Sequence, residues 1–150
     1  MMKFMSRLLK QSNETSEGGG SAPVLEKSAS NYESVVSIHS KAVSGVIFAI
    51  HRMSFGRRME LSRRIRDLSR KAEFLEAGSG RQEKIEANIL AQEIDAMYLE
   101  WGLLRIDGFI IDGEPASAAR LLERGPEDLT REVVSAIKEQ CGLSESEIKN

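Results

Sequence analysis

The amino-acid sequence predicts a mainly α-helical domain with a small β element, an α+β fold, behind a flexible N-terminal arm. Apolar residues recur with a period of two near residues 46–55, and short apolar segments with Asp-Gly turn signals lie near residues 103–111; both patterns predict short strands. They recur with a helical period over two long segments between residues 57 and 104. Two shorter helical patterns follow. We therefore expect an antiparallel helical hairpin, short strands and two C-terminal helices.

Size and composition suit one folded domain in a reducing compartment. The chain has 150 residues, 41% of them hydrophobic and 29% charged, as in ordinary globular proteins. Cys141 is the only cysteine, so the sequence offers no disulfide. Residues 1–10 lack an apolar run of signal-peptide length, and no segment reaches the ~20 apolar residues that span a bilayer. We expect a cytoplasmic protein that is neither secreted nor embedded in a membrane.

Residues 1–30 are predicted to form a flexible arm, and residues 31–150 a single mostly helical domain. The segment QSNETSEGGGSAP has no aromatic and no aliphatic residue larger than alanine. Burial therefore cannot offset the entropy lost when this segment is ordered. A solvated tail is the favoured interpretation. The alternative is a segment that orders on a partner, with Met1–Leu9 as a small amphipathic anchor.

The first predicted strand is centred on Val46–Ile50, and Val35–Ile38 is a candidate pairing partner. Apolar residues occupy both faces of Val46–Ile50, which favours a strand covered on both sides. Further along, Leu103–Ile106 and Phe109–Ile111 are short apolar segments, each followed by an Asp-Gly turn signal. They predict a small hairpin.

Two amphipathic helices are predicted next, the first from Arg57 to about Ala77 and the second after Gly78-Ser79-Gly80. Each has a narrow apolar seam that steps by three and four residues: Leu61, Ile65, Leu68, Ala72 and Leu75, then Ala87, Leu90, Ile94, Met97, Trp101 and Leu104. A short loop between two seams predicts an antiparallel hairpin. Because the first helix is rich in arginine and the second in glutamate, we expect ion pairs between them that set register.

Proline and glycine delimit the two C-terminal helices. Pro115 is expected to open a short helix that stops at Gly125, and Pro126 to begin a longer one. The longer helix has one apolar face, made of Leu129, Val133, Ile137 and Cys141. Gly142 suits the left-handed residue that closes a helix, and Ser144 could cap a final turn over residues 145–150.

The sequence carries no recognisable catalytic, nucleotide-binding or metal-ligand motif. His39 and His51 are interpreted as ordinary residues on or beside a strand, and Cys141 as core filling. The stretch Asp107–Glu114 lacks the regular alternation of a calcium loop and is better explained by turns. We therefore expect a protein that is not an enzyme and holds no cofactor.

The arginine-rich helix, residues 57–71, is the sharpest chemical feature. Its cations could neutralise phosphates, but Glu60 and Asp67 interrupt them and the net charge of the chain is −2. A solvated face paired with an acidic neighbour is the favoured interpretation, and a small nucleic-acid-binding regulator is the alternative. Trp101 is favoured as a core anchor over a binding residue. The candidate partner-binding residues are Arg57, Arg58, Arg63, Arg64, Arg70, Trp101, Leu129 and Val133.

Five segments, in this order, resemble the tail assembly chaperones of long-tailed bacteriophages: GVIFAIHRMSFGRRMEL, EIDAMYLEWGLLRIDG, IDGEPAS, RGPEDLTREVVSAI and GLSESEIKN. The resemblance implies a non-enzymatic protein of the host-cell cytoplasm, with the tape measure protein and the tail tube protein as partners. Such a chaperone keeps the tape measure protein soluble and aids tube assembly around it. Self-association and a frameshift-extended form are also compatible with this family. The resemblance does not extend to residues 1–30.

Overall fold

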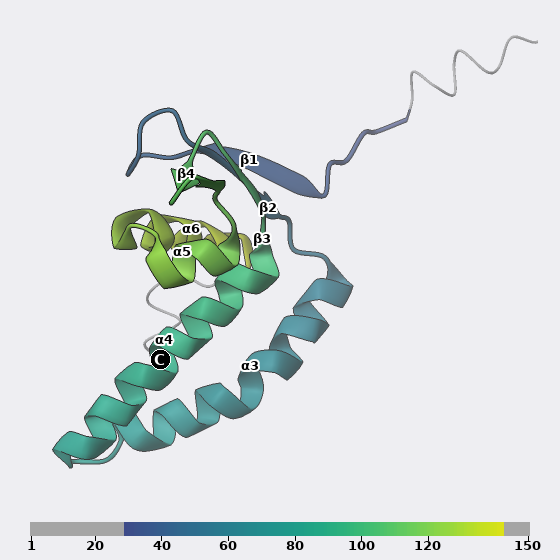
Figure 1. The fold of residues 1–150 in the computed structure, drawn as a ribbon. Helices are drawn as coiled ribbons and strands as arrows, with labels where there is room; N and C mark the ends of the chain where they lie inside the picture. The colour runs from purple at the N-terminus through teal and green to yellow at the C-terminus, as the bar shows by residue number, and fades with distance from the viewer. Residues whose placement is uncertain (1–28, 143–150) are drawn as a thin grey trace, which may run out of the picture. The chain divides into compact units, whose positions relative to one another are not determined.

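The computed structural model describes residues 29–142 (Figure 1). The chain divides into a unit Met1–Tyr32 and a unit Glu33–Asn150, and every helix and strand described below belongs to the second unit. The arm expected for residues 1–30 lies almost entirely outside the described residues. The final turn expected over residues 145–150 also lies outside them.

The predicted α+β class is confirmed, and its β element is an antiparallel sheet of three strands. Strand β2 (Ile47–His51) lies between β1 (Val35–His39) and β3 (Leu103–Asp107). The pairing expected between Val35–Ile38 and the central strand is confirmed. In β2, Phe48, Ala49 and Ile50 are fully buried, which explains why the sequence is apolar on both faces of this strand.

A second pair of strands differs from the hairpin that the sequence predicts. Strands β4 (Ile110–Ile111) and β5 (Glu114–Pro115) pair across a turn at Asp112-Gly113. Both turn residues have positive φ, 50° and 82°, as a tight I′ hairpin turn requires. Leu103–Ile106 does not pair with this hairpin, because Ile106 enters the main core through the pairing of β3 with β2.

Helices α3 (Phe55–Glu76) and α4 (Arg81–Gly102) form the predicted antiparallel hairpin and lie side by side (Figure 1). Helix α3 starts before Arg57 because the Ser54 hydroxyl accepts a hydrogen bond from the Arg57 N–H at 3.2 Å. The seams face inward, with Leu61, Ala72, Ala87 and Leu90 buried. Leu104 is the exception. It is exposed on β3, because α4 ends at Gly102.

The ion pairs expected between the two helices are absent. Among residues 29–142, no ion pair joins α3 to α4. Arg64 instead pairs with Glu60 one turn away on α3, at 2.7 Å, and Arg66 pairs with the adjacent Asp67 at 3.2 Å. Exposed ion pairs contribute little to stability, so the two helices can pack without them.

Helices α5 (Ala118–Arg124) and α6 (Glu127–Gln140) complete the fold, and α6 packs against α4 and β2. Helix α5 starts after Pro115, which lies in β5, because Ser117 caps it by accepting from the Arg120 N–H at 3.3 Å. Helices α4 and α6 approach closely at Gly102, where a Cβ atom would lie 2.5 Å from Cγ2 of Ile137. The largest fully buried side chains are Phe48, Ile50, Leu99, Leu121, Leu129 and Ile137.

Candidate protein-interaction surface

Arg57 and Trp101 join the start of α3 to the end of α4. The Arg57 guanidinium lies 4.1 Å from the centroid of the indole ring, and its Nη2 donates a hydrogen bond to the Trp101 carbonyl at 2.7 Å. Trp101 is only 8% exposed. Arg57 Nε and Trp101 Nε1 are buried and have no hydrogen-bond partner among residues 29–142. This stacked pair holds the start of α3 against the end of α4, so both residues have a structural role.

Arg58 and Cys141 form a second link at the same end of α3. Arg58 Nη1 donates to the Cys141 carbonyl at 3.1 Å. Burial raises the pKa of the Cys141 thiol, although the nearby Arg58 and Arg57 oppose the shift. On β2, burial and then the charge of Arg57 lower the pKa of His51. Burial keeps the Cys141 thiol in its neutral form, which is a weak nucleophile.

Leu129 and Val133 are core residues of α6, with 0% of either side chain exposed. Their selection as partner-binding candidates is corrected by this burial, because neither side chain reaches the surface in this fold. The apolar face predicted for this helix, including Ile137 and Cys141, is confirmed as buried. It packs against α4 and the sheet.

The other three candidates, Arg63, Arg64 and Arg70, are exposed on α3. Arg64 is paired with Glu60, whereas Arg63 and Arg70 form no ion pair with the described residues. Helical spacing of four, three, four and four places these two arginines in one row opposite the seam. We call this the outer row of α3, and its members are Met59, Arg63, Arg66, Arg70 and Phe74.

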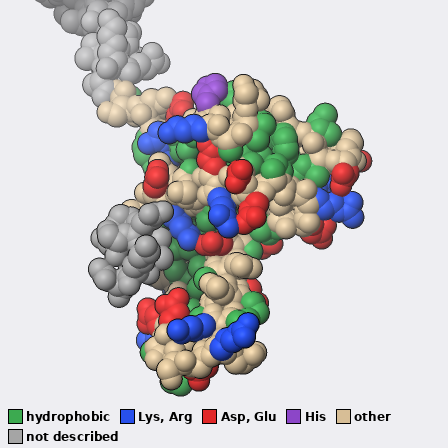
Figure 2. All heavy atoms as spheres, turned by 90° about the vertical axis from the view of Figure 1, so that its left-hand side faces the viewer, with side chains coloured by type: hydrophobic (Ala, Val, Ile, Leu, Met, Phe, Trp, Pro, Cys, Tyr) green, Lys and Arg blue, Asp and Glu red, His purple; other side chains and the backbone are tan. Residues whose placement is uncertain are grey.

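Large apolar side chains are exposed where the hairpin turns. Phe74 is 79% exposed near the end of α3, and Ile85 and Ile89 are 46% and 50% exposed one turn apart at the start of α4. We call these three residues the distal apolar set. Figure 2 shows this end of the hairpin as the lower lobe, where hydrophobic side chains lie among acidic and basic ones. The sequence alone did not identify this set, although each of its residues lies outside the apolar seam of its own helix.

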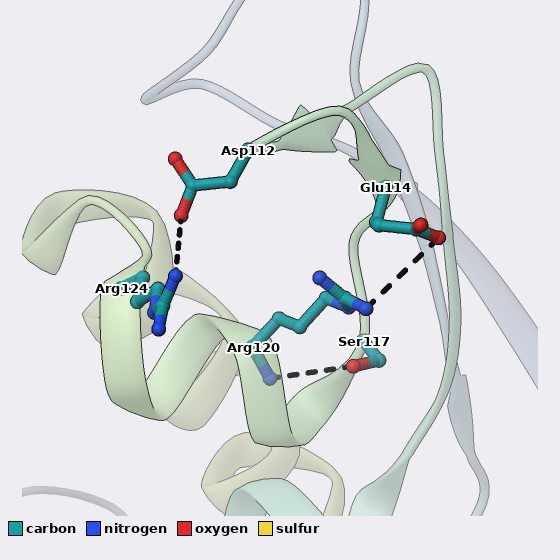
Figure 3. Close-up of polar contacts among 5 residues, drawn as sticks. All are labelled: Asp112, Glu114, Ser117, Arg120 and Arg124. Atoms are coloured by element: carbon teal, nitrogen blue, oxygen red, sulfur yellow. Dashed lines mark hydrogen bonds and ion pairs between the residues drawn. The ribbon is translucent and has the colours of Figure 1, made fainter.

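The β4–β5 hairpin directs its carboxylates at arginines of α5 (Figure 3). Asp112 pairs with Arg124 at 3.2 Å and Glu114 with Arg120 at 3.9 Å. These are two of the three carboxylates of the stretch Asp107–Glu114, for which turns are a better explanation than a calcium loop; the third, Asp107, pairs with Arg105 at 3.0 Å. Within residues 29–142, no group of three or more His, Cys, Asp or Glu residues is placed to hold a metal ion. The pairs are exposed, so each stabilises the fold by at most about 1 kcal/mol.

Glu132 of α6 holds the loop between β1 and β2. Its carboxylate accepts hydrogen bonds from Ser40 Oγ at 2.5 Å, the Lys41 N–H at 2.6 Å and the Ala42 N–H at 3.2 Å. Burial alone would raise the pKa of this carboxyl. The three hydrogen bonds and the charge of Lys41 outweigh burial, so the pKa lies below its ordinary value.

Comparisons with known proteins found no relative of this chain. No family model, curated protein or solved structure matches it. In the part of the chain that the structure describes, no helix combines the length and the apolar character needed to cross a bilayer.

Proposed function

We propose that this protein is a non-enzymatic tail assembly chaperone of a bacteriophage, acting in the cytoplasm of the host cell. It binds the tape measure protein through the distal end of the α3–α4 hairpin and aids assembly of the tail tube. The observation that carries the proposal is the exposure of the distal apolar set, Phe74, Ile85 and Ile89. The five sequence segments that resemble tail assembly chaperones support the same conclusion.

The distal apolar set has the chemistry that binding to an apolar client requires. Full burial of one large apolar side chain contributes about 1.5–3 kcal/mol, and Ile85 and Ile89 are 46% and 50% exposed, so burial of their exposed halves would together supply roughly that amount. Ile85 and Ile89 are four residues apart, the spacing with which a helix presents anchors to a partner helix or groove. A helical, apolar client therefore fits this surface.

The outer row of α3 favours a second candidate, a small nucleic-acid-binding regulator. Arg63, Arg66 and Arg70 share one exposed face and could follow a phosphate backbone. Two features oppose it: Asp67 already pairs with Arg66, and the net charge of the chain is −2. The apolar client remains the better fit.

A co-expression experiment tests the proposal. The protein is co-expressed with the tape measure protein of the same genome, and the complex is captured at low salt and at about 0.5 M salt, where exposed charges are screened. We expect the wild type to keep the client soluble and to retain it at both salt concentrations. The double variant Ile85→Ser/Ile89→Ser should lose it.

Two control variants separate the candidates. Ile110→Ser removes an exposed isoleucine on β4, outside the α3–α4 hairpin, and this variant should retain the client. Replacing Arg63, Arg64 and Arg70 with alanine should also leave client binding intact. Loss of the client in the arginine variant or at high salt, with nucleic acid bound to the wild type at low salt, would contradict the chaperone proposal and favour the regulator.

A further inference from the structure

The outer edge of β1 carries unpaired backbone groups. The Ser40 N–H donates to the Val46 carbonyl at 2.9 Å, and the Arg52 N–H donates to the Ser34 carbonyl at 2.8 Å. Hydrogen-bonded positions alternate along an antiparallel ladder, so the even-numbered residues of β1 bond to β2. The N–H and C=O groups of Val35, Ser37 and His39 therefore point away from the sheet. In the described part of the chain, no strand pairs with them.

The two edges of this sheet differ in how they resist pairing with another chain. The β3 edge has an exposed Arg105–Asp107 ion pair at 3.0 Å, and its pairing with β2 is interrupted by a bulge between Ala49 and Ile50. Charges and bulges are the usual devices that protect an edge strand. Strand β1, VVSIH, has no lysine, no acidic residue, no proline and no bulge against β2. Of the two edges of this sheet, the β1 edge lacks these protective features and is the better candidate for strand addition.

We propose that β1 pairs with β1 of a second copy of this chain, in antiparallel orientation about a two-fold axis at Ser37. The proposal is independent of the client. In this register Ser37 faces its own equivalent and Val35 faces His39 of the second copy, so all three outward-facing residues are used. Shifting the register leaves at least one of them unpaired within the strand. The result is a continuous six-stranded sheet.

The side chains of β1 suit this self-pairing. Val36 and Ile38 are half-buried on the face that packs against the core. In the proposed register Val36 lies opposite Ile38 of the second copy, in a non-hydrogen-bonded pair where side chains approach most closely. The apolar face of the sheet therefore continues across the two-fold axis. No side chain of fixed charge faces another of the same sign, because β1 contains no acidic residue, lysine or arginine.

Disulfide trapping and sedimentation of the full chain test the proposal. Ser37→Cys places two thiols at a hydrogen-bonded pair, where Cα atoms lie ~5.5 Å apart, within reach of a disulfide. We expect rapid oxidation to a covalent dimer. Two controls give the background rate of cross-linking. One is the wild type, whose one cysteine is buried, and the other is Ser135→Cys, which places a cysteine at an exposed position of α6. Sedimentation of the wild type should show a reversible dimer.

Two substitutions at Ser37 should dissociate that dimer without unfolding the chain. Ser37→Pro removes an N–H that points outward and makes no bond to β2, so the native ladder stays intact. Ser37→Lys sets two ammonium groups opposite each other and should weaken dimerisation by roughly tenfold or more, whereas Ser135→Lys should not. A monomer at every concentration, a dimer that persists in Ser37→Lys, or cross-linking of Ser37→Cys no faster than Ser135→Cys would overturn the proposal.

Discussion

The two ends of α4 are embedded in very different surroundings. Its C-terminal half packs on several elements, and Tyr98, Leu99, Trp101 and Gly102 are buried there. Its N-terminal half contacts α3 through a seam in which only Ala87 and Leu90 are buried. The sheet end thus holds most of the buried apolar area, whereas the hairpin end leaves Phe74, Ile85 and Ile89 in solvent. Helix α4 therefore contributes to the main core at one end and, through Ile85 and Ile89, to the candidate binding surface at the other.

Core truncation should have the largest effect and should differ between the two ends. Leu129→Ala empties a fully buried site and should destabilise the protein by about 2–5 kcal/mol. Leu68→Ala removes the same atoms from the half-buried seam of α3 and should cost about 1 kcal/mol. Chemical denaturation checks both variants. Equal losses would show that the hairpin is packed as densely as the sheet end.

A matched pair of glycine substitutions sharpens the comparison. At Gly102, a Cβ atom would lie 2.5–2.9 Å from three carbons of Ile137, so Gly102→Ala should destabilise by about 1–3 kcal/mol. At Gly56, in the first turn of α3, a Cβ atom meets nothing within 4 Å. Gly56→Ala should therefore be neutral or stabilise by up to about 1 kcal/mol. Thermal denaturation of both variants should show opposite or clearly unequal shifts.

Glu132 provides a pH-dependent test of the sheet end. Its folded pKa is depressed, so its contribution is present above the unfolded pKa and is lost as the pH falls through the folded value. Glu132→Gln should cost about 1–2 kcal/mol at pH 7. The difference from wild type should shrink as the pH drops below about 4. A difference independent of pH would mean that the charge of Glu132 does not hold the loop.

Changes in the distal apolar set should affect stability least. Phe74 is 79% exposed, and phenylalanine and serine have similar helix propensities. Phe74→Ser should therefore change the free energy of unfolding by no more than about 0.5 kcal/mol. A loss comparable to that of Leu68→Ala would show that Phe74 is packed in solution and is not available to a client.

The periodic features of the fold could be predicted from sequence, because each depends on neighbours in the chain. The seams of α3 and α4, the glycine-rich loop between them and the apolar face of α6 follow from spacing alone. Contacts between distant segments could not be predicted. Leu103–Ile106 joins β2 instead of the nearest strand, and Tyr98 and Leu99 form a second buried face of α4 against elements far along the chain.

The candidate site was less predictable than the fold. Arginine spacing identified the exposed Arg63 and Arg70, but a pattern of charges cannot tell a solvated row from Arg57, which stacks on Trp101. The apolar face of α6 looked equally suited to a partner or to a core, and burial of Leu129 and Val133 decides for the core. The sequence held one indication that the distal apolar set is exposed: Phe74, Ile85 and Ile89 lie outside the apolar seams of their helices.

Hydrogen exchange with and without the client tests most directly whether the distal hairpin is the binding surface. In the free protein, amides of the distal hairpin, residues 70–92, should exchange faster than those of β2 and α6, because fewer buried side chains hold them. On addition of the tape measure protein, we expect new protection in residues 70–92 and little change in β2 or α6. Protection confined to the sheet or to α5 and α6, with residues 70–92 unchanged, would contradict the proposed surface.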